Sequence, residues 1–411
     1  MGSRRSGRLH AGDGIRARLR RRALRRRRRR GLDLRRRRVR GRSLGSARLG
    51  TAPRAPSRAE PATPRRPYRV SATSASVTAP GYQNAVYESA PAPDPFVLDN
   101  GDAHNDYWAF STGDRFPILH SSDLVHWVSA GTAMSSRPSW VLRSGDWHPW
   151  SPSVVALGGR FVMYYTGLVA TPRQTPNLTN CIGIATASNP GGPYVDHGPL
   201  DLIAGATPGR PLGCGDASSQ GNIDPAPFID DDGQAYLYVS TDFDCSSGIC
   251  KLQPTISAIP LAADLLHAIG PRVPLFSGSQ PWEQGPAAPT VEGPAMVKHD
   301  GLYYLLYSGG NWQGSYAMGY ATAPTPLGPF TKHAGNPIMS ATSSVLSPGG
   351  GGSPLTGPRG GLWIAYHGRD WSYANPRTLR IDPFPWQASA PGEPDIAAIA
   401  GPTSDPQPTV P

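Results

Sequence analysis

A repeating unit constrains the fold of this chain more than any other feature of its sequence. Each copy has an acidic or small residue next to a proline, then a short apolar run, a glycine turn and an aromatic-rich run. The aromatic run usually ends in Ser, Thr or Gly. Recurrence of this kind indicates a fold assembled from equivalent units. The prolines that mark the five copies are Pro95, Pro152, Pro225, Pro294 and Pro354, at spacings of 57, 73, 69 and 60 residues.

The two apolar runs of each copy predict an antiparallel hairpin. The pairs between them readily adopt the positive φ that tight hairpin turns need. They are Asn100-Gly101, Gly158-Gly159, Asp232-Gly233, Asp300-Gly301 and Gly360-Gly361. Each interval is long enough for a four-stranded antiparallel sheet with its loops. We therefore predict an all-β fold, a five-bladed β-propeller over residues 71–390. A β-sandwich would also contain many short strands, but it would not explain the repeat.

The two ends of the chain differ from this body. Residues 1–70 hold 26 of the 40 basic and 3 of the 29 acidic residues, which leaves 14 basic and 26 acidic residues for the remainder. With few aromatic or β-branched residues, they are expected to form a disordered Arg-rich tail. The arginines would suit a nucleic-acid-binding arm, although nothing downstream resembles a nucleic-acid module. Alternatively, the segment is upstream sequence included by a wrong start site. Residues 391–411 are Pro-rich and read as a tail or linker.

The compartment is predicted from weaker signals. Residues 1–70 contain no apolar run of signal-peptide or membrane-spanning length. The small residues of 71–80 resemble the region after a signal-peptide cleavage site, and we expect a secreted protein without a membrane anchor. Oxidised cysteines would fit that location; four reduced thiols are the alternative. The spacing of Cys181, Cys214, Cys245 and Cys250 is not that of a zinc site, and a disulfide could close the short loop from Cys245 to Cys250.

Three acidic residues lie at or just before the marked prolines: Asp94, Asp224 and Glu292. The innermost strands of a propeller line its central channel, so equivalent positions converge there. A single Asp-Pro pair is typical of a turn. Three acids at one level of one cavity are unfavourable unless they serve chemistry or a metal. The sequence therefore predicts a functional carboxylate site at the propeller axis.

These residues and several neighbouring motifs resemble glycoside hydrolase family 43. The similar stretches are Asp94-Pro-Phe-Val97, Ser122-Asp-Leu-Val-His-Trp127, Trp150-Ser-Pro-Ser-Val154, Ile223-Asp-Pro-Ala-Pro-Phe228, Val291-Glu-Gly-Pro-Ala-Met296 and Arg380-Ile-Asp382, within about residues 85–390. The resemblance implies that Asp94 is a general base, that Glu292 is a general acid and that Asp224 orients and tunes the acid.

Hydrolysis with inversion requires these residue types. One ionised carboxylate activates water and one protonated carboxyl group protonates the leaving oxygen, about 6.5–9.5 Å away. A third carboxylate near the acid would raise its pKa and keep it protonated. Glu283 is a competitor for the acid role. We favour Glu292 because it lies at the repeat position.

Other residues are candidates for contacts around the acids. Aromatic side chains can cover the apolar faces of sugars, and Trp150 stands where the family commonly has Trp in a Trp-Ala-Pro motif. Three further tryptophans would either reach a substrate or pack between blades: Trp147, Trp282 and Trp312. His367 is predicted to contact substrate, with a structural role as the alternative.

The resemblance implies no required cofactor. Many members carry a His after a Gly-Pro-Gly segment, where it can help to hold a channel ion. The run of glycines from 349 to 352 in this chain replaces that segment and puts a channel Ca²⁺ in doubt.

The resemblance implies an enzyme that acts, as a monomer, on plant cell-wall polysaccharides or oligosaccharides containing arabinose or xylose. We expect an α-L-arabinofuranosidase. A β-xylosidase and an endo-1,5-α-L-arabinanase share the motifs. A non-catalytic sugar-binding propeller is a further alternative, which the retention of all three acids disfavours.

Overall fold

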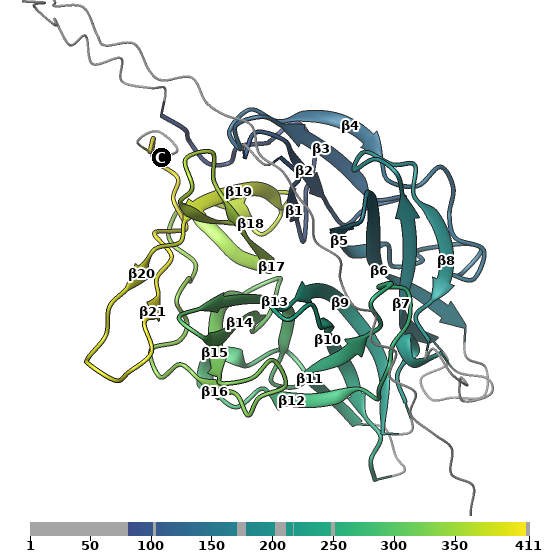
Figure 1. The fold of residues 1–411 in the computed structure, drawn as a ribbon. Coiled ribbons are helices and arrows are strands. Elements are labelled where there is room, and N and C mark those ends of the chain that lie inside the picture. Colours follow the sequence, from purple (N-terminus) through teal and green to yellow (C-terminus); the bar gives the residue numbers. More distant parts are fainter. Residues whose placement is uncertain are drawn as a thin grey trace, which may run out of the picture. The chain divides into compact units, whose positions relative to one another are not determined.

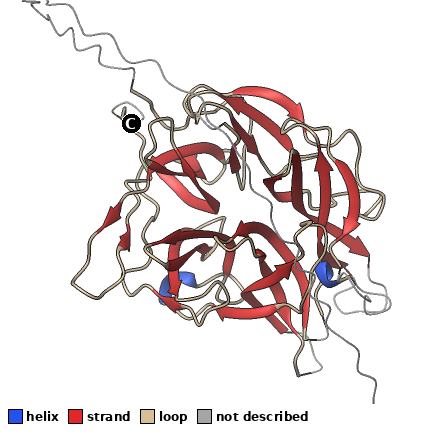
Figure 2. Ribbon diagram, viewed as in Figure 1, coloured by secondary structure: helices blue, strands red, loops and turns tan. Residues whose placement is uncertain are grey.

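The computed structural model describes residues 81–101, 104–170, 178–201, 211–216, 218–247 and 251–407. Apart from two short 3-10 helices, η1 (Leu212–Cys214) and η2 (Pro281–Glu283), the regular structure of these residues is β-strand (Figure 2). The predicted all-β fold is confirmed. The disordered tail predicted for residues 1–70 lies outside the described residues.

Five antiparallel sheets surround a common centre and form the blades of a propeller (Figure 1). Blade one contains β1 (Phe96–Asp99), β2 (Tyr107–Phe110), β3 (Pro117–Ser121) and β4 (Val128–Thr132). Blade two contains β5 (Trp150–Leu157), β6 (Arg160–Ala170), β7 (Leu178–Ala187) and β8 (Val195–Pro199). Blade three contains β9 (Ser219–Ile229), β10 (Ala235–Asp244), β11 (Lys251–Leu261) and β12 (Val273–Ser277). Blade four contains β13 (Val291–His299), β14 (Leu302–Gly309), β15 (Ala317–Ala323) and β16 (Thr331–Lys332). Blade five contains β17 (Val345–Thr356), β18 (Leu362–Asp370) and β19 (Thr378–Pro383).

The apolar core is divided among the interfaces between blades. The residues that the structure describes contain five clusters of buried side chains, each drawn mainly from two neighbouring blades. Between blades one and two, for example, Phe110 and Phe116 pack with Met163 and Tyr165. Fully burying each such side chain contributes about 1.5–3 kcal/mol. Side chains from the aromatic-rich second strands of the repeat therefore pack between adjacent blades and stabilise their interfaces.

The predicted hairpin turns are confirmed in most blades. Gly158 and Gly159 both have positive φ, as do Asp300 and Gly301. The tight turn predicted at Asn100-Gly101 is wrong. The Asn100 N–H donates to the Asp106 carbonyl across a longer loop.

The segment before blade one closes the circle against blade five. Tyr87 forms a β-bridge with Leu379 of β19. Asn84, which is buried, donates through Nδ2 to the Ile381 carbonyl at 2.7 Å and accepts the Ile381 N–H at 3.0 Å. These contacts occupy the outer edge of a blade that has only three strands.

The chain after blade five also packs on the propeller. β20 (Trp386–Gln387) pairs with β21 (Ile396–Ala397), and Gln407 forms a bridge with Tyr82. The prediction of a Pro-rich tail or linker from residue 391 is therefore wrong for the part that the structure describes, up to residue 407.

Disulfide bonding is confirmed, with a pairing that the spacing did not indicate. Cys181 of β7 is bonded to Cys214 of η1, across 33 residues. Cys245 is also disulfide-bonded. Its predicted partner, Cys250, lies outside the described residues.

Candidate active site

A bulge in the innermost strands points side chains toward the axis. Asp94, Ser151, Asp224 and Gly293 each directly precede a marked proline and have φ between 44° and 58°. Residues before proline normally favour extended backbone, and a non-glycine residue in the left-handed region costs about 1–3 kcal/mol. In blades two to four the pairing register shifts at this point. A β-bulge of this kind re-aims a side chain and is common beside active sites.

The repeat alignment of Glu292 and of blade five needs correction. Asp94 and Asp224 occupy the same strained position, whereas Glu292 is one residue earlier, at the position of Trp150. In blade five, Ser353 pairs with Ala365 as Ser153 pairs with Tyr164 in blade two. The residue equivalent to the marked prolines is therefore Gly352, and the choice of Pro354 was wrong.

A circle of side-chain hydrogen bonds joins each blade to the next at this level. One polar residue from the second strand of each blade, or just after it, bonds to the backbone of the following innermost strand. The five contacts are Thr112 Oγ1 with Ser151 N–H (2.9 Å), Thr166 Oγ1 with Asp224 N–H (3.2 Å), Ser240 Oγ with Val291 O (3.1 Å), Ser308 Oγ with Gly350 N–H (3.0 Å) and His367 Nδ1 with Asp94 N–H (3.0 Å). We call these contacts the inter-blade circle. It holds the strained backbone from which the acids project.

Asp94 is arranged to be ionised. Its burial alone would raise the pKa, but the Arg377 guanidinium at 2.9 Å and the Thr112 hydroxyl at 2.7 Å hold the pKa of Asp94 well below its usual range. His367 is fully buried and accepts the Asp94 N–H through Nδ1. Burial and the Arg377 charge lower the pKa of His367 to about 4. The imidazole is therefore neutral.

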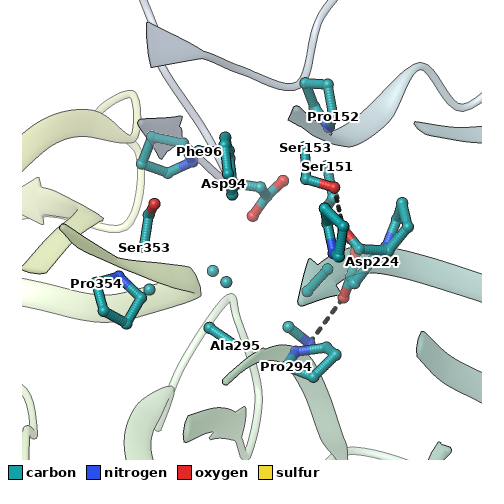
Figure 3. Close-up of a pocket in the computed structure, with 18 of the residues that line it drawn as sticks. Asp94, Phe96, Ser151, Pro152, Ser153, Asp224, Pro294, Ala295, Ser353 and Pro354 are labelled. Carbon is teal, nitrogen blue, oxygen red and sulfur yellow. Dashed lines mark hydrogen bonds between the residues drawn. The ribbon is translucent and has the colours of Figure 1, made fainter. Parts of the chain in front are cut away.

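The pKa of Asp224 lies between those of the two other acids. Burial and the Asp94 charge raise the pKa of Asp224 to about 7. Its carboxylate accepts the Ser151 hydroxyl at 2.5 Å and the Gly293 N–H at 3.0 Å (Figure 3). Both donors favour its ionised form.

Glu292 is arranged to be protonated. Burial and the Asp224 charge raise the pKa of Glu292 to about 8. It has one described hydrogen-bond partner, the Tyr316 hydroxyl at 2.8 Å from Oε1. Because Asp224 has two donors and Glu292 has one, the proton of this coupled pair resides mainly on Glu292.

The three acids share one cavity of about 340 Å³. Its lining also contains aromatic and charged side chains that suit a sugar ring. The lining residues are Asp94, Asp146, Trp150, Ser151, Ile223, Asp224, Glu292, Trp312, Tyr316 and Arg377. A second, smaller cavity of about 160 Å³ shares Asp94, Ser151 and Asp224 with this cavity, and Figure 3 shows these residues projecting toward its open space.

The predicted aromatic contacts are separated by the structure into two groups. Trp150 lies in the cavity wall and stacks on His148 at a centroid distance of 3.6 Å. Trp312 also lines the cavity. Trp147 is buried in the cluster between blades one and two. Trp282 stacks on Tyr307 in the cluster between blades three and four.

Two other candidates do not line the cavity. Glu283 is fully buried and is bound by Lys332 at 2.6 Å and by the Tyr307 hydroxyl at 2.7 Å. It stabilises the loop that precedes blade four. The substrate contact predicted for His367 is not supported, because this side chain is fully buried behind Asp94 and is absent from the cavity wall.

Several cavity residues were not singled out by sequence reasoning. Asp146, Tyr316 and Arg377 come from loops, where the repeat gives no equivalent position. Asp242 of β10 is a fourth acid whose charge acts on both Asp224 and Glu292. Burial raises the pKa of Asp242 to about 6, and Asn180 donates to it at 3.2 Å. Asp242 lies in the aromatic-rich strand β10, where no motif of the sequence marks it as a site residue.

The nitrogen and oxygen atoms around these two cavities that could bind a metal do not fit a calcium ion. His367 Nε2 is buried without a hydrogen-bond partner among the described residues, so it has one free nitrogen to offer. Calcium takes about six to eight oxygen ligands. The carboxylates of Asp94 and Asp224 are already engaged by Arg377, the Thr112 and Ser151 hydroxyls and the Gly293 N–H.

A propeller with one ionised and one protonated carboxyl group in the same axial cavity has the features of a glycoside hydrolase. The sequence profile described as Glycosyl hydrolases family 43 matches residues 82–390, a span that contains all five blades. The chain belongs to glycosyl hydrolases family 43.

Individual relatives agree with this assignment. The crystal structure of a thermostable family-43 glycoside hydrolase is 28% identical, with a TM-score of 0.63, over 80% of this chain and 99% of that one. The extracellular exo-α-(1→5)-L-arabinofuranosidase ArbA of Cellvibrio japonicus is 26% identical over 278 residues, which cover 66% of this chain and 72% of that enzyme. An arabinoxylan arabinofuranohydrolase of Paenibacillus polymyxa is 28% identical over 246 residues, 54% of this chain. The match spans only 34% of that relative's length.

Proposed function

We propose that this protein is an inverting glycoside hydrolase that releases α-L-arabinofuranosyl units from arabinose-containing plant polysaccharides or oligosaccharides. The observation that carries the proposal is that two carboxyl groups with opposite surroundings line one cavity: Asp94 is bound by the Arg377 guanidinium, and Glu292 by the neutral Tyr316 hydroxyl. The names of the relatives that act on arabinoxylan and on α-(1→5)-linked arabinose support the choice of sugar.

In the proposed mechanism, Asp94 is the general base. Its carboxylate takes a proton from a water molecule as that water attacks the anomeric carbon. Arg377 and Thr112 keep the carboxylate ionised and fix its orientation. Glu292 is the general acid and gives its proton to the glycosidic oxygen as the bond to the anomeric carbon breaks. The product sugar has inverted configuration.

Asp224 acts through the acid in this mechanism. Its negative charge raises the pKa of Glu292, and its bond to the Gly293 N–H links it to the residue next to the acid. Trp150 provides an apolar surface for one face of the sugar ring.

The setting of the activity is part of the proposal. We propose that the enzyme acts outside the cell, as a monomer and without a metal cofactor. The disulfide between Cys181 and Cys214 supports an oxidising compartment, and one relative is named as extracellular. Among the described residues, no helix is both long and apolar enough to cross a membrane.

The test is a panel of 4-nitrophenyl glycosides and polysaccharides. We expect turnover of the α-L-arabinofuranoside and release of arabinose from arabinoxylan or linear arabinan. Proton NMR of the first-formed sugar should show inversion, and activity should survive EDTA. Faster cleavage of the β-D-xyloside would assign a β-xylosidase, and internal cleavage of linear arabinan would assign an endo-arabinanase. Retention of configuration would refute the mechanism.

A further inference from the structure

Exposed aromatic side chains gather beside the active-site cavity. Among the described residues, the large aromatic side chains with high exposure are Trp312 (42%), Trp371 (70%) and Tyr373 (44%). The exposed aliphatic side chains lie on other segments of the chain: Val128, Leu178, Val195, Ile229, Leu252, Ile269 and Leu327. A clustered apolar surface of this kind marks an interaction site more often than scattered exposure does.

The three aromatic residues belong to two loops that contact each other. Trp312 lies between β14 and β15, whereas Trp371 and Tyr373 lie between β18 and β19. The Tyr373 hydroxyl donates to the Gly314 carbonyl at 2.7 Å, which joins the two loops. We call Trp312, Trp371 and Tyr373 the aromatic platform.

The aromatic platform is continuous with the cavity. Trp312 forms part of the cavity wall. The Arg377 guanidinium lies 5.1 Å from the centre of the Trp312 ring and also binds Asp94 at 2.9 Å. Arg377 ends the loop that carries Trp371 and Tyr373. A chain that leaves the cavity past Trp312 would therefore meet the two loops that carry the aromatic platform.

The loop of Trp371 and Tyr373 is held in place before any ligand binds. Asn375 donates through its backbone N–H to the Ser372 carbonyl at 3.0 Å and through Nδ2 to the Asp370 carbonyl at 2.6 Å. The Trp371 N–H donates to the Ser344 carbonyl at 3.0 Å. Trp371 has a φ of 49°, which is rare for a bulky side chain. A fixed loop loses little conformational entropy on binding, which favours a rigid platform.

The side chains around the rings suit a carbohydrate. Asn311 and Gln313 flank Trp312 in the sequence, and Ser372 lies between Trp371 and Tyr373 on the other loop. Aromatic faces can pack on the C–H faces of a sugar ring while amides and hydroxyls bond to its hydroxyl groups. A glycoside hydrolase that acts on a polymer must also accommodate the units next to the scissile bond.

We propose that the aromatic platform binds the sugar units that neighbour the one held in the cavity, on a pentose-containing polysaccharide chain. The inference rests on the proposed function of the cavity. It assigns preference for polymeric over small substrates to Trp371 and Tyr373.

The first test compares polymer and aryl-glycoside kinetics in Trp371→Ala, Tyr373→Ala and the double variant. We expect kcat/KM on arabinoxylan or linear arabinan to fall by about 5- to 20-fold, mainly through KM. Turnover of 4-nitrophenyl α-L-arabinofuranoside should stay within about twofold of wild type, because this substrate has one sugar unit and no neighbouring sugar units for the aromatic platform to bind. Trp371→Phe should restore part of the polymer activity.

The matched control is Val128→Ala, which removes a side chain of similar exposure, 62%, from the outer strand β4. It should leave both substrates unaffected. Equal losses of kcat/KM on polymer and aryl glycoside, or no loss on either, would overturn the proposed role of the aromatic platform. A wild-type protein without turnover of any glycoside would instead refute the proposed function.

A binding measurement separates the aromatic platform from catalysis. In the Glu292→Gln background, migration through a gel containing arabinoxylan or arabinan should be retarded, and Trp371→Ala with Tyr373→Ala should relieve the retardation. Unchanged retardation would place the polysaccharide elsewhere and contradict the proposal.

Discussion

At the scale of single residues, the donors around each carboxyl group decide its role. Asp94 has a guanidinium beside it, Asp224 has two neutral donors, and Glu292 has one hydroxyl. Burial acts on all three and opposes ionisation. Only a full positive charge overcomes that effect, because charge-assisted contacts are the strongest in a buried site.

Replacement of either proposed catalytic acid should remove activity without unfolding the protein. Asp94→Asn and Glu292→Gln keep the shape of the side chain but lose the base or the acid. We expect kcat to fall by about 10²- to 10⁴-fold. The measurement is turnover of an aryl arabinofuranoside, with circular dichroism as the control for folding. Near-normal turnover in either variant would contradict the assignment.

The alkaline limit of activity should report Glu292. The acid works only while protonated, so kcat/KM should hold below a pH of about 8 and fall as the pH rises through the pKa of Glu292. Asp224→Asn removes a negative charge that raises this pKa. Its alkaline limb should therefore move to lower pH. The check is a pH profile of kcat/KM for both proteins, and an unmoved limb would show that Asp224 does not tune the acid.

At the scale of strands and turns, the sequence predicts hairpin turns that require residues with positive φ. It does not predict the alignment of blade five or the loop residues that reach the cavity. The Gly158-Gly159 and Asp300-Gly301 hairpins follow from the positive φ of their turns. In blade five, glycines occupy positions 349–352, so no side chain marks the equivalent position and Pro354 gives a false alignment. The loop residues Tyr316 and Arg377 reach the cavity through tertiary packing that no repeat encodes.

The Cys181–Cys214 disulfide joins β7 to η1, next to the innermost strand β9. Asn222 of β9 donates to the Leu212 and Gly213 carbonyls. The Cys181→Ser and Cys214→Ser double variant should lower the free energy of unfolding by about 2–4 kcal/mol, because it frees a closed loop in the unfolded chain. Urea denaturation of the oxidised protein and the variant measures this. Reduction of the wild-type protein should give a loss at least as large, because it also breaks the disulfide of Cys245; equal stability of all forms would contradict the prediction.

At the scale of the whole molecule, five blades were predictable but their closure was not. The repeat sets the number of blades, and each blade interface has its own apolar cluster. The closing segment contributes single bridges at Tyr82 and Tyr87 and the amide of Asn84. Such contacts need no alternation of apolar and polar residues, so the sequence carries no strand signal there.

Asn84→Ala should weaken this closure. The substitution leaves the Ile381 N–H and carbonyl without their partner in a buried site, at a cost of about 1–3 kcal/mol. Denaturant unfolding measures the change. Gln83→Ala is the matched control, since Gln83 is exposed and its amide makes one contact, to the Ser404 carbonyl. An Asn84 variant as stable as the Gln83 variant would contradict a role in closure.

The bridge between Tyr82 and Gln407 brings the two ends of the folded unit together. Within the described part of the chain, residues 82–407 therefore run almost a full circuit and end beside the point where they began. Blade order, and not the position of the break in the backbone, defines the architecture. A circular permutant that links these ends and opens at the Gly158-Gly159 hairpin would retain the same five neighbours in the same order. It would add a covalent connection to the hydrogen-bonded seam between blades five and one and move the break in the backbone into blade two, between β5 and β6.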